Sequence, residues 1–165
     1  MVLMENGSIW GHGAYLGPDF SAQYLHNLVG DAEITEARNL DAFRPAALTG
    51  PQRKQAGEEI RRELKQNRYE PSTKTLPLTD AEVASFRRQL GYWADYFAHP
   101  RGNRGLPENY ITDSNKLRDL TAFFAWTAWA SVANRPGKPY SYTNNFRTIL
   151  LPETRRPVRR FCGAR

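Results

Sequence analysis

Apolar residues recur at steps of three and four along much of the chain, which is the spacing of a helix with one buried face. The clearest series is Val83, Phe86, Leu90, Trp93 and Phe97. It follows Thr79-Asp80-Ala81-Glu82, a capping box that opens a helix. It ends at His99-Pro100, because the residue before a proline avoids helical geometry. The pattern therefore predicts a helix between Thr79 and His99.

Similar patterns predict three further helices. Asp19 can cap the first, which Gly30-Asp31 can interrupt and Pro45 limits. A second is expected over about residues 52–67, with a narrow apolar stripe and charges of both signs toward solvent. The last is expected from residue 112 or 113 to about residue 134, before Arg135-Pro136-Gly137 stops it.

Turn-forming residues between Tyr69 and Pro77 predict a short hairpin or a wide loop. The 165 residues suffice for one domain with a single core. The fold class that follows is mainly α, a single domain of about four helices with a small β-hairpin.

The last predicted helix contains no charged residue between Leu120 and Ala133. This run is shorter than the roughly 20 apolar residues that cross a bilayer. It fits a buried helix, or one that lies against a membrane or a partner. Its large aromatic residues are Phe123, Phe124, Trp126 and Trp129.

The net charge of +6 is concentrated at one end of the chain. Six of the 23 basic residues are arginines between Arg147 and Arg165, a segment with one acidic residue, so the rest carries 17 basic and 16 acidic residues. A protein that binds nucleic acid spreads its cations over a folded surface. The charge is therefore weak evidence for nucleic acid, and we do not expect it as a partner.

Cys162 is the single cysteine, which excludes an internal disulfide, a cysteine-rich zinc site and the Cys-x-x-Cys-His attachment of a haem. The first residues have neither a basic segment nor an apolar run of signal-peptide length. We therefore expect no export signal and no membrane helix in this chain.

No set of residues forms a recognisable active site, and we predict no catalytic residue in this chain. His12, His26 and His99 are far apart, and a turn, a helix surface and a helix end explain them better than ligand binding does. The carboxylates of Glu58, Glu59, Asp113 and Asp119 are better explained as parts of solvated helix faces. Core packing is favoured over ligand binding for the aromatic cluster of Tyr92, Trp93, Tyr96 and Phe97.

Five blocks of sequence together carry a resemblance to a known family. They are Gly7–Ala22, Asn67–Pro71, Leu120–Trp129, Asn134–Gly137 and Tyr140–Asn145. In this order and spacing they resemble the quinol-dependent nitric oxide reductases of the haem–copper oxidase superfamily, over about residues 6–145. That part is similar to the large extramembrane domain between the family's first and second membrane helices, on the periplasmic or outer side of the bacterial inner membrane.

The resemblance implies a cytochrome c-like hydrophilic domain that has lost its haem. The family reduces two molecules of nitric oxide to nitrous oxide with quinol electrons, at haem b and non-haem iron held by later membrane helices. This chain is therefore expected to hold no cofactor and to be non-catalytic alone. Its expected partner is the membrane-helix catalytic core of the same enzyme, which it would cap, with the aromatic residues between Phe123 and Trp129 in its core or against that bundle.

The resemblance also implies one metal site. In related enzymes the Gly-His-Gly-x-Tyr block lies near the haem propionates, where a calcium ion or ordered water bridges domains. By that similarity Gly13 and Tyr15 would line a calcium or water site in the intact enzyme. Fixing a sharp turn is an equally supported role for both residues.

Residues 146–165 depart from the family, which continues with Trp-Pro-Pro-Glu and a membrane helix. We expect them to form a disordered basic tail outside the domain of residues 6–145, and the chain to be a fragment or the product of a shifted reading frame. One rival hypothesis is a small basic binding module whose Arg-rich tail contacts nucleic acid or anionic lipid. Another, an independent enzyme, requires a catalytic constellation that the sequence does not show.

Overall fold

The helices follow the apolar pattern of the sequence. The computed structural model describes residues 6–11, 16–100, 102–103 and 105–143. Its elements are α1 (Phe20–Asn39), the short 3-10 helix η2 (Pro45–Ala47), α2 (Gly50–Lys65), α3 (Asp80–Ala98) and α4 (Ser114–Val132). The predicted fold class, a mainly α domain with four helices, is confirmed. Among the described residues, no helix is long and apolar enough to cross a membrane.

Each of the four long helices begins at a side chain that caps its first turn. Thr49 and Thr79 belong to capping boxes at the starts of α2 and α3. The carboxylates of Asp19 and Asp113 accept hydrogen bonds from backbone N–H groups in the first turns of α1 and α4. These caps satisfy donors that no carbonyl inside the helix can reach, so short local signals set where the helices start.

Two sequence predictions differ from the structure. Helix α1 is continuous through Gly30-Asp31, because a glycine inside a helix costs only about 1 kcal/mol and packing against α3 and α4 outweighs it. The hairpin is reduced to a single antiparallel bridge between Glu70 and Thr75. Prolines at 71 and 77 remove backbone donors on either side of it, so the wide loop was the better alternative.

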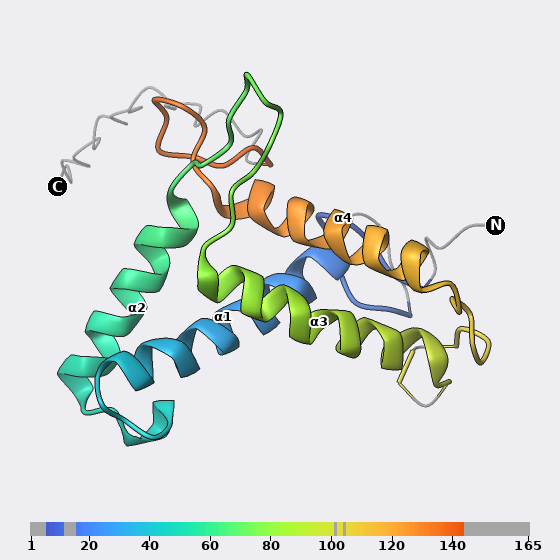
Figure 1. Ribbon diagram of the computed structural model, residues 1–165, viewed down its shortest axis with the longest axis horizontal. Helices are drawn as coiled ribbons and strands as arrows, with labels where there is room; N and C mark the ends of the chain where they lie inside the picture. Colours follow the sequence, from blue (N-terminus) through green and yellow to red (C-terminus); the bar gives the residue numbers. More distant parts are fainter. Residues whose placement is uncertain (1–5, 12–15, 101, 104, 144–165) are drawn as a thin grey trace, which may run out of the picture.

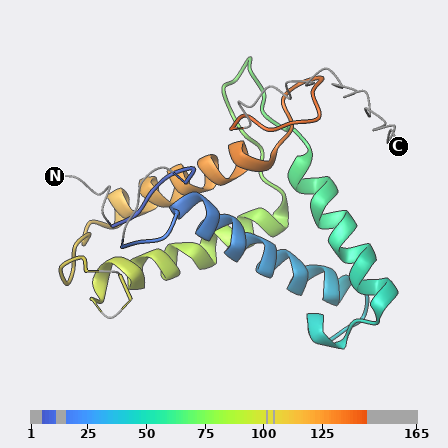
Figure 2. The same ribbon diagram turned by 180° about the vertical axis from the view of Figure 1, so that it is seen from behind.

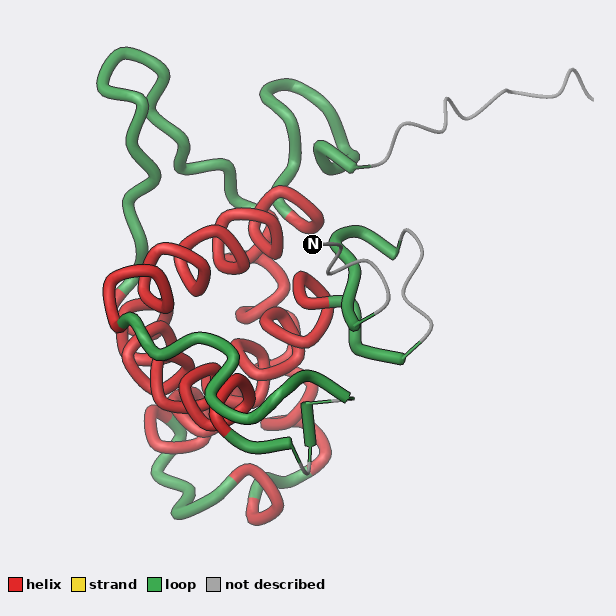
Figure 3. Tube along the Cα trace, turned by 90° about the vertical axis from the view of Figure 1, so that its right-hand side faces the viewer, coloured by secondary structure: helices red, strands yellow, loops and turns green. Residues whose placement is uncertain are grey.

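Helices α1, α3 and α4 pack against one another in every pairwise combination, and α2 packs against α1 and reaches the end of α4 (Figures 1 and 2). The loops around residues 66–79 and 133–143 lie at the same end of this group (Figure 1), and Figure 3 shows loops at the ends of the helices. The described residues contain no extended strand, only isolated bridges. The helices thus form one framework with loops gathered at its ends.

Aromatic rings from three helices meet at the centre of the core. Phe20 of α1 stacks on Phe124 of α4 with ring centroids 4.8 Å apart, and meets Trp93 of α3 edge-on at 5.6 Å. Trp93 and Phe124 also contact each other at 4.8 Å. All three side chains are at most 5% exposed. Since each ring touches the other two, this triad joins α1, α3 and α4.

Two smaller apolar clusters lie outside this core. One joins the end of α1 to α2 through Ala37, Leu48 and Ala56. The other surrounds Trp129 near the end of α4 and includes Tyr142. The apolar face of α4 therefore serves both the central core and the loop end of the molecule.

The central triad generates a stability prediction. Replacing Phe124 by Ala removes a ring from a site where its neighbours cannot collapse, so the free energy of unfolding should fall by about 3–5 kcal/mol. The matched control is Phe43→Ala, since Phe43 is 95% exposed and its loss should change stability by less than about 0.5 kcal/mol. Urea unfolding followed by circular dichroism measures both. Equal effects of the two substitutions would contradict this description of the core.

Candidate functional site

The segment before α1 crosses over itself at very short range. Ser8 forms a parallel bridge with Asp19, in which its N–H donates to the carbonyl of Pro18 at 3.1 Å. A Cβ atom on Gly17 would lie 1.4 Å from the carbonyl oxygen of Asn6, and one on Gly7 would lie 2.1 Å from the ring of Phe20. Only glycine fits at both positions. The Gly-rich opening of the chain is thus needed for this crossing.

Asp19 holds the crossing together and caps α1 at the same time. One carboxylate oxygen accepts hydrogen bonds from the hydroxyl of Ser21 and from the N–H of Ala22, the latter at 2.8 Å. The other accepts from the hydroxyl of Ser8 at 3.1 Å and from the N–H of Gly11. Both oxygens are therefore occupied within the chain, and Asp19 acts as a clamp on residues 8–11.

The pKa of Asp19 lies below its ordinary value of 3.8. Desolvation by burial is the largest single effect and raises the pKa, but the four hydrogen bonds, led by that from Ser21, together outweigh it. They favour the ionised carboxylate. The clamp is consequently strongest in the charged form of Asp19.

Trp10 leads from this crossing onto α4. Its indole N–H donates to the carbonyl of Thr127 at 3.0 Å, and its ring centroid lies 6.3 Å from that of Trp126. Its backbone has a φ of 59°, a left-handed conformation that costs a bulky residue about 1–3 kcal/mol. The fold therefore holds Trp10 against α4 at a conformational cost.

The aromatic residues of α4 divide between two faces. Phe124 and Trp129 are buried, whereas Phe123 and Trp126 are 45% and 46% exposed. The rings of Phe123 and Trp126 stack at 6.3 Å with an interplanar angle of 24°. Trp10, itself 39% exposed, extends this row. We call Trp10, Phe123 and Trp126 the α4 aromatic patch.

A group of polar contacts around Asn67, which we call the Asn67 junction, lies at the end of the molecule where α2 and α4 finish. The side-chain amide of Asn67 donates to the carbonyl of Asn134 at 2.9 Å and to the hydroxyl of Tyr142 at 2.8 Å. The N–H of Asn134 donates in return to the carbonyl of Lys65 at 3.0 Å. Three of the blocks that carry the family resemblance thus meet here, although Asn67 is 67 residues before Asn134 in the sequence.

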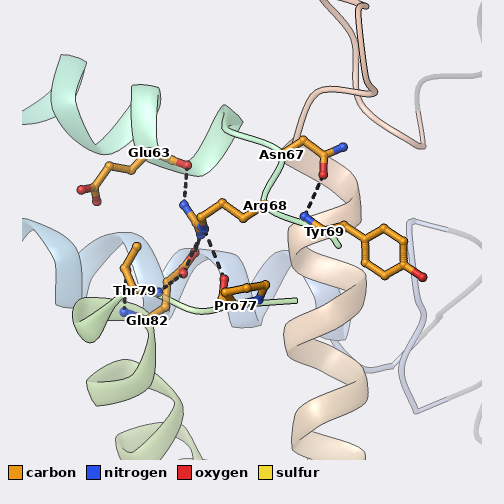
Figure 4. Close-up of polar contacts among 7 residues, drawn as sticks. All are labelled: Glu63, Asn67, Arg68, Tyr69, Pro77, Thr79 and Glu82. Atoms are coloured by element: carbon orange, nitrogen blue, oxygen red, sulfur yellow. Dashed lines mark hydrogen bonds and ion pairs between the residues drawn. The ribbon is translucent and has the colours of Figure 1, made fainter. Parts of the chain in front are cut away.

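Arg68 extends the junction to α3. Its guanidinium lies 2.5 and 2.6 Å from the two carboxylate oxygens of Glu82, and donates to the carbonyls of Glu63 and Pro77 at 3.1 and 3.3 Å (Figure 4). Glu82 also accepts the N–H of Thr79 at 2.7 Å, which completes the capping box. The two charged side chains are only 15% and 12% exposed. This buried pair ties the end of α2 to the start of α3.

The other predicted candidates lie where simple structural roles explain them. His99 is the C-cap of α3 and lies 2.9 Å from the carboxylate of Asp95, one turn earlier. His26 is exposed on α1. Glu58 and Glu59 face solvent on α2, each beside a basic residue of the same helix. These residues are not brought together into one site.

The predicted aromatic cluster is mainly core packing. Trp93 and Phe97 are at most 1% exposed, whereas Tyr92 is 41% exposed. Asp113 caps α4, and Asp119 is exposed on its first turns. Tyr92 lines a surface pocket with His26 and Arg88, whereas Trp93 and Phe97 are buried in the core.

The predicted calcium or water site falls outside the described residues. Gly13 and Tyr15 lie there, as does His12, so their roles stay predictions. In residues 6–11, 16–100, 102–103 and 105–143, no group of three or more histidine, cysteine or acidic side chains is placed to hold a metal ion. Residues 144–165, with Cys162 and the Arg-rich tail, are also outside this part, and no described residue supports the rival binding-module hypothesis.

The clamp generates a pH prediction. Because the folded state lowers the pKa of Asp19, its stabilising contribution is complete above the unfolded value near 3.8 and is lost as the pH falls through the lower folded value. Asp19→Asn keeps a good N-cap but removes the charge. We expect it to lower the unfolding free energy by about 1 kcal/mol at pH 7, and by progressively less below pH 4. Urea unfolding across this range tests it, with Asp119→Asn as the exposed control, and a pH-independent difference would contradict the clamp.

The Arg68–Glu82 pair generates a double-mutant prediction. Arg68→Met leaves the carboxylate of Glu82 largely buried without its partner, so it should cost about 3 kcal/mol of stability. Glu82→Gln preserves the capping box but also breaks the pair. The double variant should lose clearly less stability than the two single losses combined. Arg62→Met, which breaks the solvent-facing pair with Glu59, is the control and should have little effect. Additive losses at 68 and 82 would show that the two side chains are not coupled.

Comparison with known proteins identifies the family. A search among curated proteins found no match. The family model described as the cytochrome c-like domain of NorB, a subunit of nitric oxide reductase, matches residues 1–148. That range includes the N-terminal crossing, all four helices and the Asn67 junction. The chain therefore belongs to the family of NorB cytochrome c-like domains of nitric oxide reductase.

Proposed function

We propose that this chain is the extramembrane domain of a quinol-dependent nitric oxide reductase, covers the membrane-embedded catalytic core on the periplasmic side, and does not catalyse the reaction alone. The observation that carries the proposal is the filled aromatic core of a domain that belongs to a cytochrome c-like family. A cytochrome c-like domain whose core is filled by side chains has no room for a haem that carries electrons. Such a domain keeps a structural role, in which it covers the membrane-embedded part of the enzyme and holds it in place.

The residues of the core do not fit a haem. Covalent attachment of a c-type haem requires Cys-x-x-Cys-His, and the sequence has a single cysteine, Cys162. The centre between α1, α3 and α4 is closed by Phe20, Trp93 and Phe124, whose rings lie 4.8–5.6 Å apart. A neighbouring cavity lined by Tyr24 and Trp129, among others, measures only about 20 Å³, whereas ligand pockets start at roughly 300 Å³.

This misfit supports quinol as the electron donor. A domain without a haem site offers no relay from a soluble cytochrome to the membrane core. Electrons for the family's reaction must then reach the membrane-embedded metals by another route, and quinol supplies them from within the membrane. The Asp19 clamp and the Asn67 junction suit a bracing role, because they fix the two ends of the helix group without placing reactive groups in a cavity.

The spectrum of the purified chain tests the proposal. We expect the full chain, produced in cells that mature both b- and c-type haem proteins, to show no Soret band and to consume no nitric oxide above the buffer rate. Titration with haem b should give no saturable spectral change, because the core has no room for the porphyrin. A small c-type cytochrome produced in the same cells is the positive control. A stoichiometric Soret band, or turnover of nitric oxide, would overturn the proposal.

A further inference from the structure

The outer face of α4 differs from the exposed faces of the other helices. From Leu120 to Val132 this helix has no charged residue, and its charged side chains are confined to the first turns, at Lys116, Arg118 and Asp119. Yet Phe123 and Trp126, in the uncharged part, are nearly half exposed. A helix that is apolar on its outer face as well as its inner face normally has a covering partner.

The fold holds the patch in one arrangement. Trp10 is fixed by its indole hydrogen bond to Thr127 and by a hydrogen bond of 3.1 Å from its own N–H to the hydroxyl of Ser21. Its left-handed backbone is a strained conformation, of the kind that clusters at sites of binding. The stacked rings of Phe123 and Trp126 complete the row. Rigid, half-exposed tryptophans are the side chains that anchor protein interfaces.

The size of the patch favours a partner that is already held close to this domain. The exposed surface of the patch is roughly 300 Å², given that an aromatic side chain presents about 150–250 Å² in full. Two free copies of a chain need about 800 Å² on each side for a stable interface. A small patch is sufficient where assembly already holds the partner nearby and raises its effective concentration.

The absence of charge argues against a bare lipid surface. Helices that lie on membranes carry many lysines and arginines on their polar face, which adds attraction to anionic lipid. Here Arg118 and Asp119 are adjacent and of opposite sign, and no cation lies between Leu120 and Val132. The patch is therefore matched to an uncharged apolar protein surface and not to a lipid headgroup layer.

We propose that the α4 aromatic patch is the surface by which this domain docks on the membrane-embedded part of the NorB protein of nitric oxide reductase. The inference rests on the proposed function and adds to it the side of the domain that faces the partner. Trp126 and Phe123 insert as anchors, and Trp10 brings the clamped N-terminal segment to the same interface. The segment between α1 and η2, where Phe43 is 95% exposed, faces away.

Site-specific photo-crosslinking tests the proposal with the full chain. The photoreactive residue p-benzoylphenylalanine replaces Trp126 in one variant and Phe43 in a matched control. Each is mixed, at the roughly millimolar concentration that a tethered domain experiences, with vesicles that contain the membrane-embedded part of a NorB protein, and with vesicles of the same lipids without protein. We expect crosslinks to the membrane protein from position 126 and not from position 43.

A second variant measures the strength of the contact. Phe123→Ser combined with Trp126→Ser should weaken association with the protein-containing vesicles at least tenfold, whereas Phe43→Ser should leave it unchanged. Because both replaced side chains are nearly half exposed, the circular dichroism spectrum and melting profile should stay close to those of the parent chain.

The outcomes separate this proposal from the proposed function. If the chain associates but crosslinks from position 43, or equally from both positions, the α4 aromatic patch is not the docking surface. The proposed capping role is not affected by that result. Failure of the parent chain to associate at all contradicts the capping role itself. Equal binding to protein-free vesicles assigns the patch to lipid and overturns the proposal. The proposal is also overturned if sedimentation shows that the parent chain is a dimer and that the double serine variant is a monomer. The patch would then bind a second copy of this chain.

Discussion

The contact between Phe20 and Phe124 is the interaction on which most of this structure depends. Phe20 is the first residue of α1, and its ring is stacked in the centre of the core 4.8 Å from that of Phe124. The residue before it, Asp19, caps the helix and binds residues 8–11. Gly7 passes directly over the same ring, at a distance that excludes a side chain. The core and the N-terminal crossing are thus built on two adjacent residues and cannot vary independently.

Helix α4 connects the N-terminal crossing with the loop end of the molecule. Its inner face supplies Phe124 to the core, its outer face supplies the aromatic patch, and its last turn meets the Asn67 junction. Two different physical devices hold these ends. A carboxylate with four donors fixes the N-terminal crossing, whereas a buried ion pair and a side-chain amide fix the loop end. Both devices hold the ends of the described domain in a fixed arrangement.

The sequence predicted those features that local chemistry determines. Helix starts at Asp19, Thr79 and Asp113 were found because a cap needs only a few neighbouring residues. The core positions of Trp93 and Phe97 followed from their spacing on one helix face. The continuity of α1 was left open, because contacts with α3 and α4 that are remote in sequence decide it.

Two parts of the candidate site could not be derived in this way. Glu82 was already explained by its capping box, so nothing signalled that Arg68 also binds it. In α4 the run without charge gave no polar face to orient the helix, so Phe123 could not be distinguished from Phe124. The ordered blocks of family-like sequence did indicate that residues near Asn67, Asn134 and Tyr142 matter. Their meeting at one junction needed the three-dimensional arrangement.

The unequal clusters along α1 imply a gradient of local stability within a single helix. Its first half is packed by large rings, whereas Ala37 near its end packs with Leu48 and Ala56 in a smaller cluster that contains no aromatic residue. A cluster of two alanines and one leucine buries less apolar area than a group of aromatic rings, so separating α2 from this tip requires less energy than opening the aromatic centre. The tip can therefore fray or accept insertions while the end that carries Trp10 and Trp126 remains folded. Sequence change among such domains would be tolerated most readily where α1 turns into α2.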